Sequence, residues 1–376
     1  MKMLYILNVA KKVNNFSYAS MIAAQKCGYD FHIAGNWSYE SDEERKSDEL
    51  KYGIKIHQID FIRKPYSLKN RKAYKQLLDL CKKEQFDVIH CNTPVGGLLG
   101  RLVGEKCKVK TIIYQAHGFH FYKGAPIINW LIYYPIEKWL ARKTDILITI
   151  NYEDYEFAKK KMRLRKDGRV AFVPGVGIDV SSFKREETIR ESKRLELSLS
   201  DEDIGVISIG DLIKRKDYIT SINAIHKTKN KNIKFFICGL GPHEKKIQKK
   251  INSMNLSNRV FLLGYRTDIK DLLCSMDIFL MTSRQEGIPR SLMEAMASSL
   301  PCVVSNIRGN VDLLDTTGGF LCNPVDSNGF AKSIDLLSED IKMRQSFGMN
   351  NLSKIISFDY KVIEKEFQKE YIKLDK

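Results

Sequence analysis

Residues 284–296 read Arg-Gln-Glu-Gly-Ile-Pro-Arg-Ser-Leu-Met-Glu-Ala-Met and directly follow the apolar run 278–281. The pattern predicts a buried strand, a short turn and a helix opened by Pro289, because proline lacks an N–H that a first helical turn leaves unpaired anyway. Glu286 then lies in the turn and Glu294 one to two turns into the helix, so we expect both carboxylates to face one cleft. The free N–H groups of the helix start form a ready anion site. Carboxylates that can accept hydrogen bonds from hydroxyls, next to backbone amides that can bind a phosphate, suit a nucleotide-sugar.

Apolar runs alternate with helix-like segments along the whole chain, which is typical of parallel α/β sheets. Glycines at 175 and 177 and a charged stretch at 184–196 indicate a hinge and a polar linker. We predict two Rossmann-like domains that face each other across a cleft: residues 1–178 bind the acceptor, residues 179–358 bind the nucleotide-sugar, and residues 359–376 form a helix that packs back on the first domain. The expected strands are 4–9, 31–34, 55–59, 88–91, 111–116, 146–150 and 171–174, then 205–210, 234–239, 260–264, 278–282, 302–306 and 319–322.

The composition is that of a globular protein, with 43% hydrophobic and 28% charged residues, and 376 residues suit two domains. The first residues do not have the pattern of a signal peptide, and the longest apolar stretch, 125–136, is shorter than the ~20 residues that span a bilayer. Eight cysteines without a C-x-x-C pair favour reduced thiols over zinc or disulfides. These features predict a cytoplasmic protein.

The net charge of +17 is concentrated in the first half of the chain: residues 1–180 hold 31 Lys and Arg against 19 Asp and Glu, and residues 181–376 hold 31 against 26. This imbalance indicates an acidic surface or ligand, or only general solubility. Residues 126–143 carry Trp130, Tyr133, Tyr134 and Trp139 among Ile and Leu and end in basic residues, which suits either a bilayer interface or a buried helix. Nucleic acid is disfavoured as a partner, because the chain lacks a recognition-helix pattern.

Two loops of the second half are candidates for phosphate binding, because each follows a predicted strand at the sheet edge where open α/β sheets bind ligands. Gly239-Leu240-Gly241-Pro242 would let backbone amides approach a phosphate, although any such turn favours glycine. Gly210-Asp211-Leu212-Ile213 leads into three basic residues, which either bind a diphosphate through Arg215 and Lys216 or form a solvated charge run.

In the first half, the strand 111–116 delivers His117-Gly118-Phe119-His120 to the same kind of edge. A histidine there can titrate near neutral pH, although a structural histidine is the more usual occurrence. Asn92 and Thr93 follow the preceding strand and would line the same face. Asp201-Glu202-Asp203 matches a metal-binding D-x-D pattern, but it precedes its strand and so lies at the wrong edge for the site.

Together these motifs resemble glycosyltransferase family 4, the retaining GT-B enzymes that use nucleotide-sugars, and most closely its bacterial exopolysaccharide and capsule branch. The resemblance covers essentially the full chain and rests on residues 117–126, 134–139, 174–179 and 286–297 in the expected order. It implies that Glu286 holds the sugar hydroxyls, Glu294 the ribose hydroxyls and Lys216 the diphosphate, while His117 reaches the donor sugar. It further implies a donor pocket with contributions from Arg215, Gly210, Gly239, Gly241, Gly287, Ile288, Pro289 and Arg266, and acceptor contacts from Asn15, Asn92, Thr93 and His120.

Two departures from the family pattern affect this assignment. Asp211 stands where many members have the arginine of Gly-Arg-Leu, so Arg215 would have to replace that phosphate ligand. The loop 11–17 lacks the frequent Gly-Gly pair, which leaves the acceptor contacts less defined. The resemblance implies a metal-independent, retaining transfer without a cofactor, from a UDP-sugar in preference to other donors, to a polyprenyl-diphosphate-linked saccharide at the inner face of the membrane. The alternatives are a nucleotide-sugar epimerase of the same fold and a basic nucleic-acid-binding protein.

Overall fold

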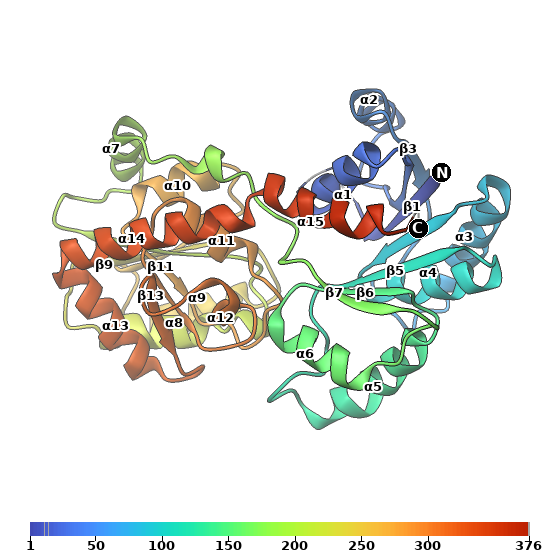
Figure 1. Ribbon diagram of the computed structural model, residues 1–376. Coiled ribbons are helices and arrows are strands. Elements are labelled where there is room, and N and C mark those ends of the chain that lie inside the picture. The colour runs from blue at the N-terminus through green and yellow to red at the C-terminus, as the bar shows by residue number, and fades with distance from the viewer. Residues whose placement is uncertain (11, 14, 375–376) are drawn as a thin grey trace. The chain divides into compact units, whose positions relative to one another are not determined.

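The computed structural model describes residues 1–10, 12–13 and 15–374, which form two compact units (Figure 1). Unit 1 comprises Met1–Gly177 together with the chain from Tyr360 onward, and unit 2 is Ile178–Asp359. Each unit has one sheet with helices packed on both of its faces. The core of each unit therefore consists of two apolar layers, one on either side of the sheet.

Unit 1 contains a seven-stranded parallel sheet in the order β3-β2-β1-β4-β5-β6-β7. Along β1, Leu4 and Ile6 join one buried cluster while Met3 and Tyr5 join the other. Because both faces are covered, the central strands are mostly apolar. The strands are β1 (Lys2–Val9), β2 (Asp30–Asn36), β3 (Lys55–Gln58), β4 (Val88–Asn92), β5 (Thr111–Ala116), β6 (Ile146–Thr149) and β7 (Arg169–Phe172), and the helices are α1 (Asn15–Lys26), α2 (Asp42–Tyr52), α3 (Asn70–Glu84), α4 (Pro94–Lys106), α5 (Ile127–Ala141), α6 (Tyr152–Lys161) and α15 (Tyr360–Ile372).

Unit 2 contains a six-stranded parallel sheet in the order β10-β9-β8-β11-β12-β13. Its strands are β8 (Ile204–Ile209), β9 (Ile233–Cys238), β10 (Val260–Gly264), β11 (Ile278–Met281), β12 (Cys302–Ser305) and β13 (Gly319–Cys322). Its helices are η1 (Val180–Phe183), α7 (Glu187–Glu196), η2 (Lys214–Lys216), α8 (Tyr218–Lys227), α9 (Glu244–Ser253), α10 (Ile269–Ser275), α11 (Arg290–Ala297), α12 (Asn310–Leu313), α13 (Ser327–Glu339), α14 (Ile341–Ile355) and η3 (Ile356–Phe358).

Every strand predicted from the sequence is present, with ends within two residues of the predicted ones. In each sheet the strand order reverses next to the first strand, between β1 and β4 in unit 1 and between β8 and β11 in unit 2. The crevice outside the carboxyl ends of such strands is where open parallel sheets bind ligands. The topology thus directs attention to the loops after β8 and β11.

The prediction of a polar linker at 184–196 is wrong, because most of this stretch forms helix α7. Its charged side chains are not simply solvated. Arg190 Nη2 lies 2.7 Å from Asp277 Oδ1, and Arg194 Nη1 lies 3.1 Å from Asp277 Oδ2. These ion pairs attach the helix to the sheet edge just before β11.

The sequence of helix α5 suited either a buried helix or a helix at a bilayer interface. The structure excludes the buried helix. Only Leu140 and Ala141 of its residues, all of which the structure describes, are buried. Large apolar side chains are instead exposed to solvent, with exposed fractions of 77% for Ile127 and 67% for Leu131. Within the described residues, no helix combines the length and the apolar composition needed to cross a bilayer.

Helix α15 packs against α1 and completes one apolar layer of unit 1 (Figure 1). Phe367 and Tyr371 are buried there. The Tyr371 hydroxyl lies 2.7 Å from Nδ1 of His90, whose imidazole ring is fully buried. Lys26 Nζ in α1 forms an ion pair with Glu364 in α15 at 2.5 Å. The last helix of the chain is therefore part of the core of unit 1.

Truncating Phe367 to alanine is expected to lower the free energy of unfolding of unit 1 by about 3–5 kcal/mol, because a buried ring is replaced by a cavity. The tryptophans of the chain are Trp37, Trp130 and Trp139, all in unit 1. Urea unfolding followed by tryptophan fluorescence therefore reports on this unit. Lys369→Ala, on the solvent side of the same helix, should change the free energy by less than ~0.5 kcal/mol. Equal midpoints for Phe367→Ala and the wild type would contradict this packing.

Candidate active site

The loops that follow β8 and β11 meet in one ion cluster at the switch point of the unit 2 sheet. Lys216, in the short helix η2 after β8, places Nζ 2.8 Å from Glu286 Oε1. Arg215 Nη1 lies 3.0 Å from Glu286 Oε2 and also donates to the carbonyl oxygen of Gln285. The side chains of Lys216 and Glu286 are only 11% and 7% exposed, whereas that of Arg215 is 43% exposed. The cluster therefore has an enclosed side and a solvent side.

The electrostatics of this cluster keep Glu286 ionised. Burial alone would raise the pKa of its carboxyl group, but the positive charges of Lys216 and Arg215 outweigh burial and hold that pKa below its usual value. At neutral pH Glu286 is therefore an anion and a pure hydrogen-bond acceptor. Such a group can accept hydrogen bonds from the hydroxyls of a sugar.

Glycines in the loops after β8 and β9 lie where these two loops pack directly on one another. Gly210 and Gly239 have φ angles of 151° and 150°, and a Cβ atom on Gly239 would lie 2.0 Å from the carbonyl oxygen of Gly210. A Cβ atom on Gly241 would lie 2.5 Å from the carbonyl oxygen of Leu212. Gly239 and Gly241 are thus required for contact between the loops after β8 and β9, whereas a Cβ atom on Gly210 would come closest to the Lys216 side chain, at 3.1 Å. That they also admit a phosphate stays a prediction.

The stretch around Gly287, Ile288 and Pro289 connects the ion cluster to helix α11. Pro289 is the residue before the helix and not its first helical residue, a shift of one position from the expected start. Glu294 is mostly buried in α11, and burial raises the pKa of its carboxyl group against the opposing charge of Arg290, whose Nε lies 2.7 Å away. Both predicted glutamates thus belong to the same strand–turn–helix unit, as the sequence indicated.

Arg266 forms ion pairs with neighbouring carboxylates, whereas Asp211 is exposed to solvent. Arg266 follows β10 and is held by Asp268, at 2.8 and 2.6 Å, and by Glu196, at 2.7 Å. These hydrogen bonds, led by those to Asp268, raise the pKa of its guanidinium. A role in contacting a base stays a prediction. Asp211, which replaces the family arginine, is exposed and lies next to Gly210.

The loop after β12 also belongs to this site, although the sequence analysis did not select it. Arg308 is buried and its Nε donates to the carbonyl oxygen of Glu286 at 3.2 Å. Gly309 has a φ of 83°, and a Cβ atom there would lie 2.1 Å from the carbonyl oxygen of Gly287. The signal was available, because Arg308-Gly309 follows a predicted strand at the carboxyl edge already used to select the other loops. Tyr218, whose hydroxyl donates to the Gly210 carbonyl at 2.8 Å, carried no such signal.

In unit 1, the ends of β4 and β5 bring His117 and Asn92 together. His117 Nε2 lies 3.0 Å from Asn92 Oδ1, and because that oxygen only accepts, the ring nitrogen donates. Phe16 packs on the His117 ring with centroids 4.5 Å apart. Burial lowers the pKa of His117 to about 4, so the ring is neutral at physiological pH.

The other predicted residues of unit 1 lie at different places around this pair. Thr93 follows Asn92 with a positive φ of 63°, and its hydroxyl donates to the Asn92 carbonyl at 2.5 Å. His120 stacks on Tyr133 of α5 with ring centroids 4.6 Å apart. Asn15 begins α1, but its side chain lies outside what the structure describes, as do Lys11 and Asn14 in the same loop.

The D-x-D stretch at 201–203 lies just before β8, at the amino edge of the sheet. Asp203 Oδ2 accepts hydrogen bonds from the backbone N–H and the hydroxyl of Ser200 and so closes a turn. In the part of the chain that the structure describes, no group of three or more His, Cys, Asp or Glu side chains is placed to hold a metal ion.

Two family models match the two halves of the chain. Residues 189–353 match the family described as glycosyl transferases group 1, and residues 3–151 match the family described as glycosyl transferase 4-like. The chain is 31% identical over 340 residues to EpsD of Bacillus subtilis (strain 168), a protein named as a glycosyltransferase. The match covers 89% of this chain and 86% of that protein. It is 28% identical to the Escherichia coli UDP-Gal:alpha-D-GlcNAc-diphosphoundecaprenol alpha-1,3-galactosyltransferase, covering 77% of this chain and 76% of that protein.

Among solved structures, Anabaena Alr3699/HepE in complex with UDP superposes with a TM-score of 0.80 over 99% of both chains, at 18% sequence identity. This likeness confirms the predicted GT-B fold as regards its two Rossmann-like domains. The two family matches and the full-length similarity to EpsD show more than the fold: the chain belongs to glycosyltransferase family 4, with relatives in bacterial exopolysaccharide and capsule synthesis.

Proposed function

We propose that this glycosyltransferase moves a sugar from a UDP-sugar to a polyprenyl-diphosphate-linked saccharide, with retention of configuration and without a metal ion. The observation that carries the proposal is the cluster of Glu286, Lys216 and Arg215 at the switch point of unit 2. The ionised carboxylate can accept hydrogen bonds from sugar hydroxyls, and the two cations beside it can bind a diphosphate. Together they suit a sugar attached to a diphosphate. The Anabaena protein, crystallised with UDP and with UDP-glucose, supports a uridine nucleotide, and the name of the Escherichia coli relative supports a lipid-linked acceptor.

In this mechanism the charges of unit 2 act on the leaving group. As the bond to the sugar lengthens, positive charge develops on the ring and negative charge on the departing diphosphate. Lys216 and Arg215 stabilise that negative charge, an electrostatic contribution that is often the largest in catalysis. Glu286 holds the sugar hydroxyls and is not a covalent nucleophile. A leaving phosphate oxygen takes the proton of the acceptor hydroxyl, which attacks on the same face of the sugar.

His117 takes part in this reaction as a neutral imidazole. Its Nε2 proton is committed to Asn92, so Nδ1 is the nitrogen that can accept a hydrogen bond from a sugar hydroxyl. Burial lowers the pKa of the ring to about 4, which argues against a protonated His117 as general acid. Its contribution is therefore positioning through one hydrogen bond.

Helix α5 supplies the membrane contact. Its exposed apolar residues Ile127, Ile128, Leu131, Ile132, Ile136 and Trp139 form what we call the α5 face. Lys138, Arg142 and Lys143 lie at the end of this helix. Buried apolar area and attraction to anionic lipids together give stable interfacial binding, which neither gives alone. The protein then works at the membrane surface that carries its acceptor.

Replacing the residues of the ion cluster should abolish transfer. With purified protein, EDTA in the buffer, a panel of UDP-, GDP- and ADP-sugars and a lipid-diphosphate saccharide, mass spectrometry should detect nucleoside diphosphate release only when acceptor is present. Glu286→Gln and Lys216→Ala should lower kcat by roughly 10²–10³-fold, the loss typical of one electrostatic group in the transition state. Lys214→Ala, an exposed lysine of the same short helix, is the matched control and should keep its activity.

The same assay separates the alternatives. NMR of the product should show the anomeric configuration of the donor sugar, and an inverted product would refute retention. A rate that depends on added Mg²⁺ would refute metal independence. Conversion of the donor to an isomer without acceptor would identify an epimerase instead of a transferase.

The pH dependence of a His117→Gln variant tests the neutral imidazole. The variant should lose about tenfold in kcat/KM, the value of one hydrogen bond to a polar substrate group. Because the pKa of His117 is about 4, the ratio of wild-type to variant kcat/KM should stay constant between about pH 8 and about pH 5.5. A ratio that changes tenfold across this interval would mean that His117 titrates there and acts as an acid or base.

Flotation with vesicles tests the α5 face. Wild-type protein should bind vesicles that contain phosphatidylglycerol more tightly than neutral vesicles, and the difference should shrink at high salt. The double variant Ile128→Ser/Leu131→Ser should bind at least about tenfold more weakly, because two apolar side chains no longer enter the interface. Leu195→Ser, which removes an even more exposed leucine of α7 in unit 2, should not change binding. Unchanged binding of the double variant would place the membrane contact elsewhere.

A further inference from the structure

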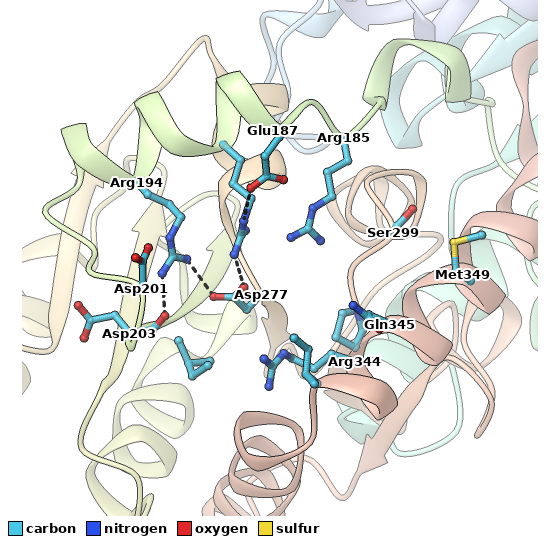
Figure 2. A pocket seen from close by; sticks show the side chains of 14 residues that line it. Arg185, Glu187, Arg194, Asp201, Asp203, Asp277, Ser299, Arg344, Gln345 and Met349 are labelled. Atoms are coloured by element: carbon cyan, nitrogen blue, oxygen red, sulfur yellow. Dashed lines mark hydrogen bonds and ion pairs between the residues drawn. The ribbon is translucent and has the colours of Figure 1, made fainter.

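A cavity lies in unit 2 at the edge of the sheet opposite to the candidate active site. It has a volume of about 560 Å³, and its lining includes Ile204 at the start of β8, Asp277 just before β11 and Pro301 just before β12 (Figure 2). The candidate active site uses the carboxyl ends of these strands, whereas this cavity uses their amino ends. Its volume lies within the ~300–1,000 Å³ of typical small-molecule sites.

Part of the cavity wall is an ion network that is already satisfied. Asp277 is buried, and its two carboxylate oxygens accept from Arg190, Arg194 and the backbone N–H of Gly205. Arg194 also donates to the carbonyl oxygens of Ser200 and Asp203. Arg190 Nε also lies 3.9 Å from Glu187 Oε1. The charges of Arg190 and Arg194 are therefore balanced by the two carboxylates of Asp277 and Glu187.

Two further arginines of the lining have no carboxylate partner. Arg344 in α14 donates through Nη1 to the carbonyl oxygens of Leu337 and Ser338, which leaves its positive charge unbalanced. Arg185 makes no hydrogen bond or ion pair with any residue that the structure describes. Arg185 is exposed as a whole residue, yet partial desolvation and, after it, the positive charge of Arg190 lower the pKa of its guanidinium against the opposing charges of Asp277 and Glu187. An anion beside Arg185 would favour the charged form of its guanidinium.

Four acidic side chains line the cavity. Asp277 and Glu187 pair with Arg190, and the charges of both also act on Arg185. Figure 2 shows Asp201 and Asp203 beside Arg194, while Arg185 and Arg344 lie toward the end that carries Gln345. Asp203 is also bound to Ser200. Among the described residues of the lining, Arg185 and Arg344 are thus the cations that have no carboxylate at ion-pair distance.

We propose that this cavity binds a small molecule that carries a phosphate group, held between Arg185 and Arg344. A guanidinium presents parallel N–H donors that match phosphate oxygens, and two of them can share one phosphate. The apolar side chains of Ile204, Pro301, Ile341 and Met349 provide the wall for the uncharged body of the molecule. This site shares no residue with the cluster of Glu286, Lys216 and Arg215. The proposal can therefore be tested independently of the transferase mechanism.

Isothermal titration calorimetry with inorganic phosphate, pyrophosphate and UMP tests this site in the full-length protein. Binding should persist in Lys216→Ala, which disables the phosphate ligand of the donor site. In that background, Arg185→Gln should weaken binding by roughly tenfold or more, the effect of losing a charged hydrogen-bond donor. Lys184→Gln, at the exposed neighbouring residue, is the charge-matched control and should bind as before.

A second variant protects the test against a folding artefact. Arg344→Lys keeps the positive charge but not the paired N–H donors, so it should also weaken binding while the unfolding midpoint stays unchanged. If UMP binds more tightly than pyrophosphate, the occupant has a body that uses the apolar wall; the reverse order identifies a free phosphate or diphosphate. No heat with any of the three probes, or binding that Arg185→Gln leaves unchanged, would overturn the proposal.

Discussion

The buried carboxylate of Glu286 is the interaction on which the site of unit 2 depends. Removing a carboxylate from water costs several kcal/mol, and the two cations that offset this cost, Lys216 and Arg215, come from the loop after a different strand. The backbone N–H of Arg284 also donates to the Arg215 carbonyl at 2.7 Å. The loops after β8 and β11 are thereby fixed to each other. Because such buried pairs add little net stability, we attribute this one to the placement of charge for a ligand.

Strand β11 has a buried carboxylate at each end, and the two differ in what surrounds them. Asp277 precedes the strand, and its arginine partners, Arg190 and Arg194, have side chains only 13% and 9% exposed. Glu286 follows the strand, and its partner Arg215 is 43% exposed. A fully enclosed network anchors α7 and has no capacity left for a ligand. A network with one cation in solvent can exchange part of its interactions for a bound diphosphate.

The sequence was sufficient for the strands and for which loops meet at their carboxyl ends, because strands covered on both faces are mostly apolar and their carboxyl ends share one edge of the sheet. It was insufficient where a charge has a distant partner. The stretch 184–196 looked like a solvated linker, because the carboxylate that binds Arg190 lies 87 residues further along the chain. Arg308 and Gly309 could have been found by the same edge argument, but their contacts with Glu286 and Gly287 depend on backbone geometry that no spacing reveals.

Within unit 1, the loop that carries His117 and the α5 face are physically connected. The chain runs from His117 into α5 through residues 118–126, and Asn129 in the first turn of that helix donates to the carbonyl oxygen of His120 at 2.9 Å. The His120 ring also stacks on Tyr133, so the loop rests on the helix at two points. If the α5 face lies on a bilayer, the His117 loop is held next to that surface. An acceptor anchored by its lipid would then present its sugar near His117 without any rearrangement of this unit.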